Sequence, residues 1–471
     1  MPQEQPLTRG DKRTSSLPAV EADVSHQSSK DHAPRLPIWM LMLVALGGLA
    51  LFLPRIAIPQ GFIFDEVFYV PGARDLLGEA PRLAIPEGEV KESQRRTASV
   101  PEGSHPPLGK FLIAAGIAVA GDNSLGWRLM SAVAGALSLT AIFLWTWLLL
   151  GSPSLALWAA AMSAVNNLLF VMARVGMLDI FCVLFLLWAL VAVTAVLQQQ
   201  VSWRAGLAGA GIFFGLAIGC KWLALAPLAA SFCLLILWSC RSSLAESNGT
   251  KPLRWSPMFE AIAGLVVVPA IVYVATFVPL AWRIHQPFSL GWFLEQQLNV
   301  IHRHVGHQGP PVQVSHFYSW PFKISPEVFY YGGESRFILL LGNPLVLWTG
   351  VVAVVFLCYR LVAAAFLQRK LGLLFSSHLS EVTILLAYAS LFSLWAIAPR
   401  KTMFYHYYFP AAMTLAPALA VAFARMRPKK IFGLEAHSCM LLGASLVFLV
   451  FFPGLAAIQT GSGWIMQFFF S

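Results

Sequence analysis

The chain has 471 residues, of which 58% are hydrophobic and 11% charged, and its mean hydropathy is +0.69. Soluble domains carry about 25% charged residues, so this composition excludes an ordinary soluble globule, a disordered chain and a disulfide scaffold, and it predicts a multi-pass membrane protein. The formal charge of +10 then reflects the two sides of a bilayer, and we expect no nucleic-acid partner.

The chain begins with a polar stretch, residues 1–36, which we expect to be a disordered cytosolic tail. A membrane span needs about 20 mostly apolar residues. Stretches of this kind predict an all-α integral membrane protein with about eleven transmembrane helices, occupying residues 37–458 and followed by a short outer tail, 459–471. The expected spans are 37–58, 125–150, 154–173, 178–197, 205–222, 223–240, 259–282, 337–359, 381–398, 405–424 and 432–458.

The distribution of Lys and Arg predicts the orientation in the membrane. With the N-terminus inside, these residues divide equally between the two sides, but the cytosolic ones form compact clusters nearly free of acids, such as Arg425–Lys430. We therefore expect a cytoplasmic N-terminus and an outer C-terminus. This orientation leaves two long outer loops, 59–124 and 283–336, which are rich in acids, His, Pro and aromatic residues. Any chemistry is therefore expected on the outer side.

The first outer loop opens with an adjacent acidic pair, Asp65 and Glu66, among aromatic residues that include Tyr69. Such a pair beside a span is costly to desolvate unless it has partners. One interpretation is a general base with a second carboxylate that holds it or a ligand, and the other is a solvated loop turn. The next residues predict an amphipathic interfacial helix with Arg74 and Asp75 facing outward.

Later in the same loop, His105 precedes two prolines and a short apolar run, 108–120. This run is too short for a comfortable span, so it predicts a re-entrant or interfacial helix. A Pro at a helix start is ordinary, so the His-Pro-Pro sequence fits a stiff entry into the helix. Its place in the loop that carries Asp65 equally supports a functional role.

Four charged residues lie at the outer ends of spans: Arg128, Arg174, Asp179 and Lys221. A lone Arg or Lys at this depth usually extends to the headgroups. Four such residues on one side, at the depth where Asp65 emerges, favour a shared polar cavity instead. Cations in that cavity would suit a phosphate group.

The second outer loop contains His302, His304 and His307, followed by an aromatic stretch that includes Trp320. The histidine spacing matches no structural zinc pattern and no Cys joins it, so we favour contact with a phosphate or sugar over a metal site. Aromatic rings stack on sugars and also anchor at interfaces, and the sequence leaves both uses open. A third cluster on the outer side, from Arg400 to Tyr408, includes His406.

In this order, the clusters resemble the protein O-mannosyltransferase family, which belongs to the GT-C class of polyprenyl-phosphate-sugar-dependent glycosyltransferases. The resemblance covers about residues 40–425. It rests on Phe64-Asp65-Glu66, His105-Pro-Pro-Leu-Gly-Lys110, Trp127-Arg128-Leu129, Ala173-Arg174, Leu178-Asp179, Lys221-Trp222, Trp320-Pro321, Gly342-Asn343-Pro344 with Trp348, and Phe404-Tyr405-His406-Tyr407.

The resemblance implies inverting transfer of a sugar, with mannose favoured, from a polyprenyl-phosphate donor to a Ser or Thr hydroxyl of an exported protein. Asp65 would then be the general base, and Glu66 would position the donor or the acceptor. Donor phosphate and sugar contacts are implied for Arg128, Arg174, Asp179, Lys221, His105, Arg400 and His406. The outer loops add four aromatic or acceptor-side candidates: Tyr69, His302, His304 and Trp320.

The resemblance further implies that Arg and Lys take the leaving-group charge, so we expect neither a metal nor another cofactor. The second loop has no room for the β-trefoil MIR domain of eukaryotic members, which suggests a short bacterial-type member in an inner membrane with its active site outside. Two alternatives remain: a sibling enzyme that modifies lipid A or another glycolipid, and a lipid or solute transporter. The sequence does not predict the oligomeric state.

Overall fold

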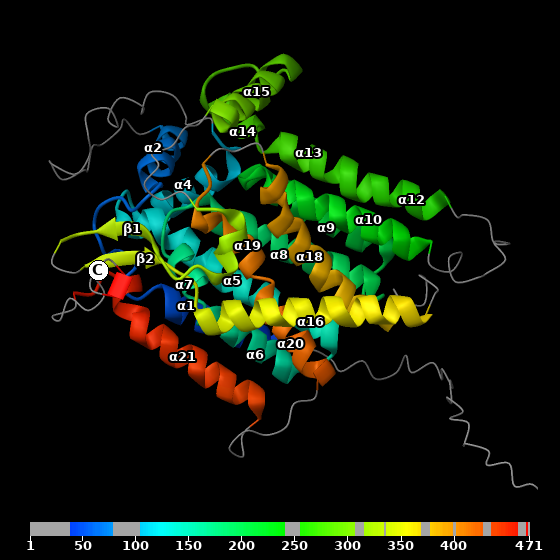
Figure 1. Cartoon of the computed structure of the whole chain (residues 1–471). Coiled ribbons are helices and arrows are strands. Elements are labelled where there is room, and N and C mark those ends of the chain that lie inside the picture. Colours follow the sequence, from blue (N-terminus) through cyan, green and yellow to red (C-terminus); the bar gives the residue numbers. More distant parts are fainter. Residues whose placement is uncertain are drawn as a thin grey trace, which may run out of the picture. The chain divides into compact units, whose positions relative to one another are not determined.

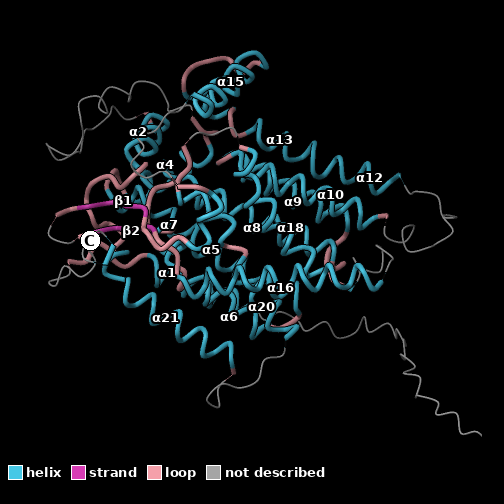
Figure 2. Tube along the Cα trace, in the orientation of Figure 1, coloured by secondary structure: helices cyan, strands magenta, loops and turns pink. Residues whose placement is uncertain are grey.

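Helices make up almost all of the chain that the structure describes. The computed structural model describes residues 38–78, 104–240, 255–306, 315–333, 336–368, 377–398, 402–426, 435–459 and 468–469. The expected tail 1–36 lies outside these residues, as does most of the expected tail 459–471. Figure 1 follows the described elements from blue to red, and Figure 2 separates helices from strands.

The first part of the chain forms α1 (Ile38–Phe52), α2 (Glu66–Leu77), α4 (Leu108–Ala120), α5 (Ser124–Leu150), α6 (Pro153–Ala164), α7 (Asn167–Met172), α8 (Leu178–Leu197), α9 (Trp203–Cys220), the 3-10 turn η2 (Trp222–Ala224) and α10 (Leu225–Ser239). Short side chains cap several of these helices. Asn123 accepts backbone N–H bonds at the start of α5, and Ser152 and Ser202 do the same for α6 and α9.

The second part forms α12 (Trp255–Ile262), the π-helical turn η3 (Ala263–Val267), α13 (Val268–Ala275), α14 (Val278–Arg283), α15 (Leu290–Gly306), the 3-10 turn η5 (Phe317–Phe322), β1 (Glu327–Tyr331), β2 (Phe337–Leu340), α16 (Pro344–Gln368), α18 (Leu379–Ile397), the 3-10 turn η6 (Tyr405–Tyr408), α19 (Phe409–Ala412), α20 (Leu415–Met426) and α21 (Ala436–Leu455). The π-helical turn lies just before Pro269, which has no N–H for the regular helical ladder.

Nine helical segments among the described residues are long and apolar enough to cross a membrane, and each matches one of the eleven expected spans. The remaining two expected spans correspond to shorter apolar helices, α1 and the pair α6 and α7. The chain is thus a mostly helical multi-pass membrane protein. The short helix expected over 108–120 is confirmed as α4, and its re-entrant or interfacial position stays a prediction.

Three expected boundaries were wrong, each for a local reason. The first helix ends at Phe52, because Pro54 disfavours the helical conformation of Leu53 before it. The expected span 154–173 is broken after Ala164, where the Asn166 side chain accepts from Leu168 N and starts α7 anew. The start of the expected span 337–359 is strand β2, and the helix begins only at Pro344.

The two strands form an antiparallel hairpin in which Glu327 pairs with Leu340 and Tyr331 with Phe337. All four residues of β2 are buried, so the hairpin is part of the packed molecule and not a free flap. It contacts α21 and α7 through β2, and Figure 1 shows it beside the end of the bundle that carries α2 and α4.

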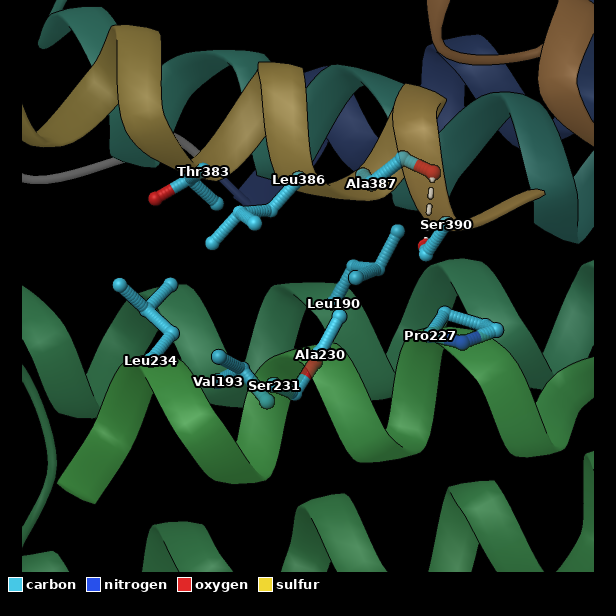
Figure 3. A pocket seen from close by; sticks show the side chains of 10 residues that line it. All are labelled: Leu190, Val193, Pro227, Ala230, Ser231, Leu234, Thr383, Leu386, Ala387 and Ser390. Atoms are coloured by element: carbon cyan, nitrogen blue, oxygen red, sulfur yellow. Dashed lines mark hydrogen bonds between the residues drawn. The ribbon is translucent and has the colours of Figure 1, made fainter. Parts of the chain in front are cut away.

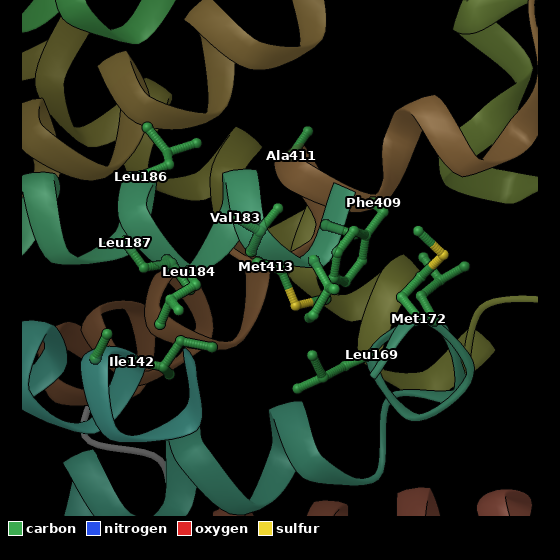
Figure 4. Close-up of a cluster of buried hydrophobic side chains, with 14 of the residues drawn as sticks. Ile142, Leu169, Met172, Val183, Leu184, Leu186, Leu187, Phe409, Ala411 and Met413 are labelled. Atoms are coloured by element: carbon green, nitrogen blue, oxygen red, sulfur yellow. The ribbon is translucent and has the colours of Figure 1, made fainter. Parts of the chain in front are cut away.

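The core lies around α5 and α8, which pack against each other, with α9 on the far side of α8. Leu169, Met172 and Val183 meet Phe409 and Met413 there, so side chains from α7, α8 and the α19 region form one buried cluster (Figure 4). Helices α16 and α21 instead leave large apolar side chains exposed on the protein alone, such as Val355, as lipid-facing helices do.

Candidate functional site

Asp65 occupies the last residue before α2, at the end of the loop that follows α1. An Asp at this position normally caps the helix, yet among the described residues its side chain makes no capping bond. The half-buried carboxylate instead accepts a long hydrogen bond of 3.4 Å from the Tyr69 hydroxyl. The preceding Phe64 has a positive φ of 48°, an uncommon conformation for a bulky residue, which indicates a constrained loop.

The electrostatic environment of Asp65 gathers four charged groups from distant parts of the chain. Burial raises the pKa of Asp65 to about 6, the charges of His406 and Lys221 lower it, and Asp179 and Glu327 raise it. These groups come from α8, the junction of α9 with η2, β1 and η6. A carboxyl group with a pKa near the working pH is well suited to take up a proton.

Lys221 and Asp179 form a buried ion pair beside this site. The Lys221 Nζ donates to Asp179 Oδ2 at 2.7 Å, and the two residues are 6% and 1% exposed. Asp179 lies in the first turn of α8, and Lys221 is the single residue between α9 and η2. Within the described part of the chain, Asp179 Oδ1 has no hydrogen-bond partner.

His406 and Glu327 form a second buried pair. The His406 Nδ1 lies 3.1 and 3.2 Å from the two carboxylate oxygens, and the His406 backbone N–H donates to Glu327 Oε2 at 2.9 Å. Both residues are nearly inaccessible; Glu327 is the first residue of strand β1, and His406 lies in η6. Sequence reasoning missed Glu327, whose only signal is an acid immediately before an aromatic strand.

Arg128, expected at the lipid phosphate, is instead fully buried and bound to protein acceptors. Its Nε and Nη2 bind both oxygens of Glu66 at 2.8 and 2.9 Å. Its remaining donors reach the backbone oxygens of Ile56, Pro59 and Gly61 at 3.0, 2.8 and 2.6 Å. All five guanidinium N–H groups thus have protein acceptors, and the phosphate contact expected for Arg128 stays a prediction.

Glu66 is likewise held by the protein. Besides Arg128, its carboxylate accepts backbone N–H bonds from Gly176 at 2.7 Å and Ile63 at 2.8 Å. It is 0% exposed. Glu66 therefore ties the loop before α2 to the turn between α7 and α8, and its expected contact with donor or acceptor stays a prediction.

Arg174 supports the same loop from another side. Its Nη1 donates to the carbonyl oxygens of Phe52 and Pro54, each at 2.6 Å, and its guanidinium lies 4.8 Å from the centre of the Phe170 ring. Phe52 is the last residue of α1, where helical carbonyls lack partners, and Pro54 lies in the loop just beyond it. Arg174 thus closes the C-terminus of α1, and its expected contact with phosphate stays a prediction.

His105 and Tyr69 lie together near Asp65. Their rings are 6.1 Å apart, and His105 is half-buried at the entry to α4. The neighbouring helix α2 differs from the prediction in one respect. Arg74 was expected to face outward, but it is buried and paired with Asp122 at 2.9 Å. The pairing across 48 residues joins the two ends of the first outer loop.

The remaining predicted residues do not join this cluster in the described part of the chain. His302 is exposed on α15, and the structure describes neither the side chain of His304 nor Arg400. Trp320 is 0% exposed and donates to Ser315 Oγ at 2.8 Å. It packs against Trp395, so it is a core residue in this structure and its expected acceptor contact stays a prediction.

No group of three or more His, Cys, Asp or Glu side chains in the described residues is placed to hold a metal ion. The histidine cluster of the second outer loop is only partly described, since His307 lies outside. A small cavity does occur between α8, α10 and α18 (Figure 3). It is lined by apolar and hydroxyl side chains such as Leu190, Leu234 and Ser390, so it lacks the charges that a phosphate requires.

Comparison with protein families gives two adjoining matches. The family model described as dolichyl-phosphate-mannose-protein mannosyltransferase matches residues 104–273. The model described as the C-terminal four TMM region of protein-O-mannosyltransferase matches residues 289–466. The two models follow each other along most of the membrane part of the chain and describe the two parts of one kind of protein.

Individual proteins agree with this assignment. The chain is 26% identical over 407 residues to a polyprenol-phosphate-mannose–protein mannosyltransferase of Corynebacterium glutamicum, covering 73% of this chain and 74% of that protein. In fold it resembles the S. cerevisiae protein O-mannosyltransferase Pmt1–Pmt2 complex bound to the sugar donor, with TM-score 0.72, 15% identity, and 89% and 90% of the two chains covered.

A second structure has the same fold less closely. ArnT from Cupriavidus metallidurans, bound to undecaprenyl phosphate, aligns with TM-score 0.56 and 15% identity, covering 92% of this chain and 80% of that one. The shared architecture is the GT-C fold expected from the sequence. The family matches, the relative and the fold together show that the chain belongs to the protein O-mannosyltransferase family.

Proposed function

We propose that this protein transfers mannose from a polyprenol-phosphate-mannose donor to a Ser or Thr hydroxyl of a protein. The family supplies the donor and the kind of acceptor. The observation that carries the assignment to this site is the half-buried carboxylate of Asp65, whose pKa of about 6 reflects burial among the charged groups of four other segments.

Asp65 is the general base of this proposal. The acceptor hydroxyl must lose its proton as its oxygen attacks the anomeric carbon, and a carboxylate within hydrogen-bond reach accelerates that step. Asp65 is free for this task because its side chain does not cap α2 among the described residues. The Tyr69 hydroxyl, which lies 3.4 Å from Asp65 Oδ2, orients the carboxylate.

Lys221 stabilises the departing phosphate in this proposal. The sugar–phosphate bond breaks with positive charge building at the anomeric carbon and negative charge on the phosphate oxygen. A cation that is already placed and sheltered from water stabilises this charge without reorganising. Lys221 meets both conditions because its Nζ is fixed on Asp179 at 2.7 Å in a buried position, and its charge acts on Asp65 from there.

The step balances without another reactant. The bond from the acceptor oxygen to the anomeric carbon forms, the bond from that carbon to the phosphate oxygen breaks, and the proton passes to Asp65. The lipid phosphate leaves with both bonding electrons. One displacement inverts the anomeric centre, so a β-linked donor gives an α-linked mannoside.

Arg128, Glu66 and Arg174 serve the reaction indirectly. Together they bind the backbone from Phe52 to Ile63 at six positions, which fixes the loop that ends in Asp65. Reacting groups must be held to well within 1 Å for efficient transfer. We therefore assign these three residues to positioning the base.

The reaction takes place on the outer face of the membrane in this proposal, with the N-terminus in the cytoplasm. The support is the charge distribution, because the cytosolic segments then carry compact basic clusters such as Arg425–Lys430. The site residues then lie at the outer ends of their helices, beside the two long loops. An exported protein is the acceptor that meets an active site on this face.

The test is a transfer assay with radiolabelled polyprenyl-phosphate mannose, using membranes that contain wild type or the Asp65→Asn variant. Wild type is expected to place label in protein, and Asp65→Asn is expected to lose about 100-fold or more of that label because the base is gone. Label that appears in glycolipid would instead indicate an enzyme of lipid modification. Absence of transfer to any pool would contradict both assignments.

The matched control is Asp75→Asn, which removes a half-buried carboxylate from the same loop. Asp75 lies on α2, where its neighbours are Arg283 and Lys110. We expect this variant to keep transfer within about three-fold of wild type, since the carboxylate is not at the reacting centre. Equal losses of transfer in the two variants would show that the effect is not specific to Asp65, and this would contradict its role as the general base.

A further inference from the structure

The ring of Phe64 joins the base to a second region of the protein. It stacks on Phe329 with ring centres 4.2 Å apart and planes 5° from parallel, and it meets the edge of His406 at 5.5 Å. Phe64 precedes Asp65 directly and has a positive φ of 48°. Its backbone conformation is unfavourable by itself, so these contacts hold the residue in place.

The region that receives Phe64 is fixed by Glu327. This carboxylate holds both the ring and the backbone N–H of His406, at 3.1 and 2.9 Å. It also starts β1, the strand that carries Phe329 two residues later. One buried acid therefore sets the relative position of the two rings between which Phe64 packs.

Pairs such as this are costly to build. A buried carboxylate is tolerated only when partners satisfy its charge and hydrogen bonds. Hydrophobic residues of similar volume often give a protein equal stability. Glu327 lies in the second outer segment, 262 positions after Asp65 in the sequence, yet its charge acts on Asp65. A role toward the base explains its place in the molecule, whereas packing alone does not require a charge there.

We infer that Glu327 and His406 form a positioning pair that holds Asp65 in its reacting orientation through the ring of Phe64. The inference rests on the proposed function, since it requires Asp65 to be the base. Glu327 itself touches neither donor nor acceptor in this scheme. Glu327 fixes His406 and β1, and these contacts hold the ring of Phe64. The position of Phe64 in turn determines the orientation of the Asp65 carboxylate.

The test compares Glu327→Gln, Phe64→Leu and the double variant, each as purified full-length protein in liposomes with labelled donor and an acceptor peptide. Each single variant is expected to lower kcat by about 10- to 100-fold, because small displacements of a reacting group have effects of this size. The KM for the donor is expected to stay within about three-fold, since the Lys221 region is unchanged.

The double variant distinguishes positioning from general damage. Both substitutions break the same series of contacts. The kcat of the double variant is therefore expected to lie no more than about three-fold below that of the less active single variant. Losses that multiply would overturn the inference, as would a raised KM with unchanged kcat. The conservative variant Phe64→Tyr keeps the ring and is expected to retain most of the activity.

A pH profile adds a measurement that simple misfolding would not move. The charges around Asp65 come from His406, Lys221, Asp179 and Glu327. His406 lowers the pKa of Asp65, so His406→Gln is expected to move the acid limb of kcat/KM to higher pH. A limb that stays in place together with an unchanged kcat would overturn the inference.

Two controls separate this inference from the proposed function. Glu295→Gln removes an exposed carboxylate on α15, in the same outer segment, and is expected to keep activity within about two-fold. Asp65→Asn tests the base itself. If Asp65→Asn is inactive while Glu327→Gln is fully active, the positioning pair is wrong and the base stands. If Asp65→Asn is active, the proposed base is wrong.

Discussion

Two adjacent carboxylates of the first outer loop differ in their surroundings: the proposed base is held loosely, whereas its neighbour is in an ion pair saturated by the protein. Asp65 has one long contact with Tyr69 and a raised pKa of about 6. Glu66, its neighbour, has four close donors that include Arg128. The two adjacent carboxylates thus differ in role. Asp65 has a pKa close to neutral pH, whereas Glu66 anchors the loop.

The saturated pair predicts a large loss of stability on substitution. Arg128→Gln leaves Glu66 charged and three backbone carbonyls without donors, and we expect it to cost about 3–5 kcal/mol. Thermal unfolding of the purified protein measures this. Arg204→Gln is the control, since Arg204 pairs with Glu260 while its own side chain is 83% exposed, and we expect at most about 1 kcal/mol. Equal unfolding temperatures for the two variants would contradict this account.

The raised pKa of Asp65 also predicts how stability varies with pH. The folded protein holds the proton more tightly than the unfolded chain, whose Asp pKa is near 3.8, so Asp65 lowers stability as pH rises from about 4 through 6. Asp65→Asn removes this effect. We expect it to unfold at a higher temperature than wild type at pH 7–8, with no difference near pH 4. A variant that is less stable at pH 8 would refute the prediction.

At the scale of elements, short polar residues at the junctions between helices and strands fix the positions of neighbouring helices. Asn343 is an example, lying between β2 and α16. Its Nδ2 donates to the carbonyls of Val165 and Ala444 at 3.0 and 2.8 Å, and its Oδ1 accepts from Leu345 N at 3.2 Å. One side chain thus joins the break after α6, the start of α16 and the middle of α21.

We expect Asn343→Ala to destabilise the protein by about 1–3 kcal/mol for each buried carbonyl left without a donor. The exposed Asn299 on α15 is a matched control, and Asn299→Ala is expected to change stability by at most about 0.5 kcal/mol. Unfolding in a graded denaturing detergent compares the two. If Asn343→Ala matches Asn299→Ala, the cross-link has no energetic value.

Sequence patterns predicted the helices well and the pairing of charges poorly. Apolar length suffices to find a span, and nine expected spans match long helices among the described residues. The hairpin was missed because Phe337–Leu340 is apolar and runs on toward α16, so hydropathy did not distinguish strand from helix. The sequence singled out Asp65 and Lys221 as candidates, and these stay predictions, whereas it did not single out Glu327, since only tertiary packing brings it to His406.

For the molecule as a whole, several charged residues of the described part are paired within the protein. Glu66 with Arg128, Asp179 with Lys221, and Glu381 with Arg425 are ion pairs that join separate helices or loops. In a low-dielectric interior, an unpaired charge would be strongly unfavourable. The charges around Asp65 form a separate polar cluster, to which the proposed function assigns the sugar phosphate.

The proposed orientation predicts which segments face the outside. A cysteine introduced for the exposed Glu295 on α15 is expected to react with a membrane-impermeant maleimide in intact cells. A cysteine introduced for the exposed Ser256, just before the seventh expected span, is expected to react only after permeabilisation. The unmodified chain measures background from its own cysteines. The reverse pattern would place the site on the cytoplasmic face.

The most direct test of the central claim is the pH dependence of kcat/KM for mannosyl transfer by wild-type protein in liposomes. This quantity reports the ionisation of the free enzyme. Because Asp65 must be ionised to accept the proton, we predict that transfer rises with pH through an acid limb near pH 6 and that Asp65→Asn shows no such limb. A profile that is flat between pH 5 and 8, or an acid limb that persists in Asp65→Asn, would contradict Asp65 as the base.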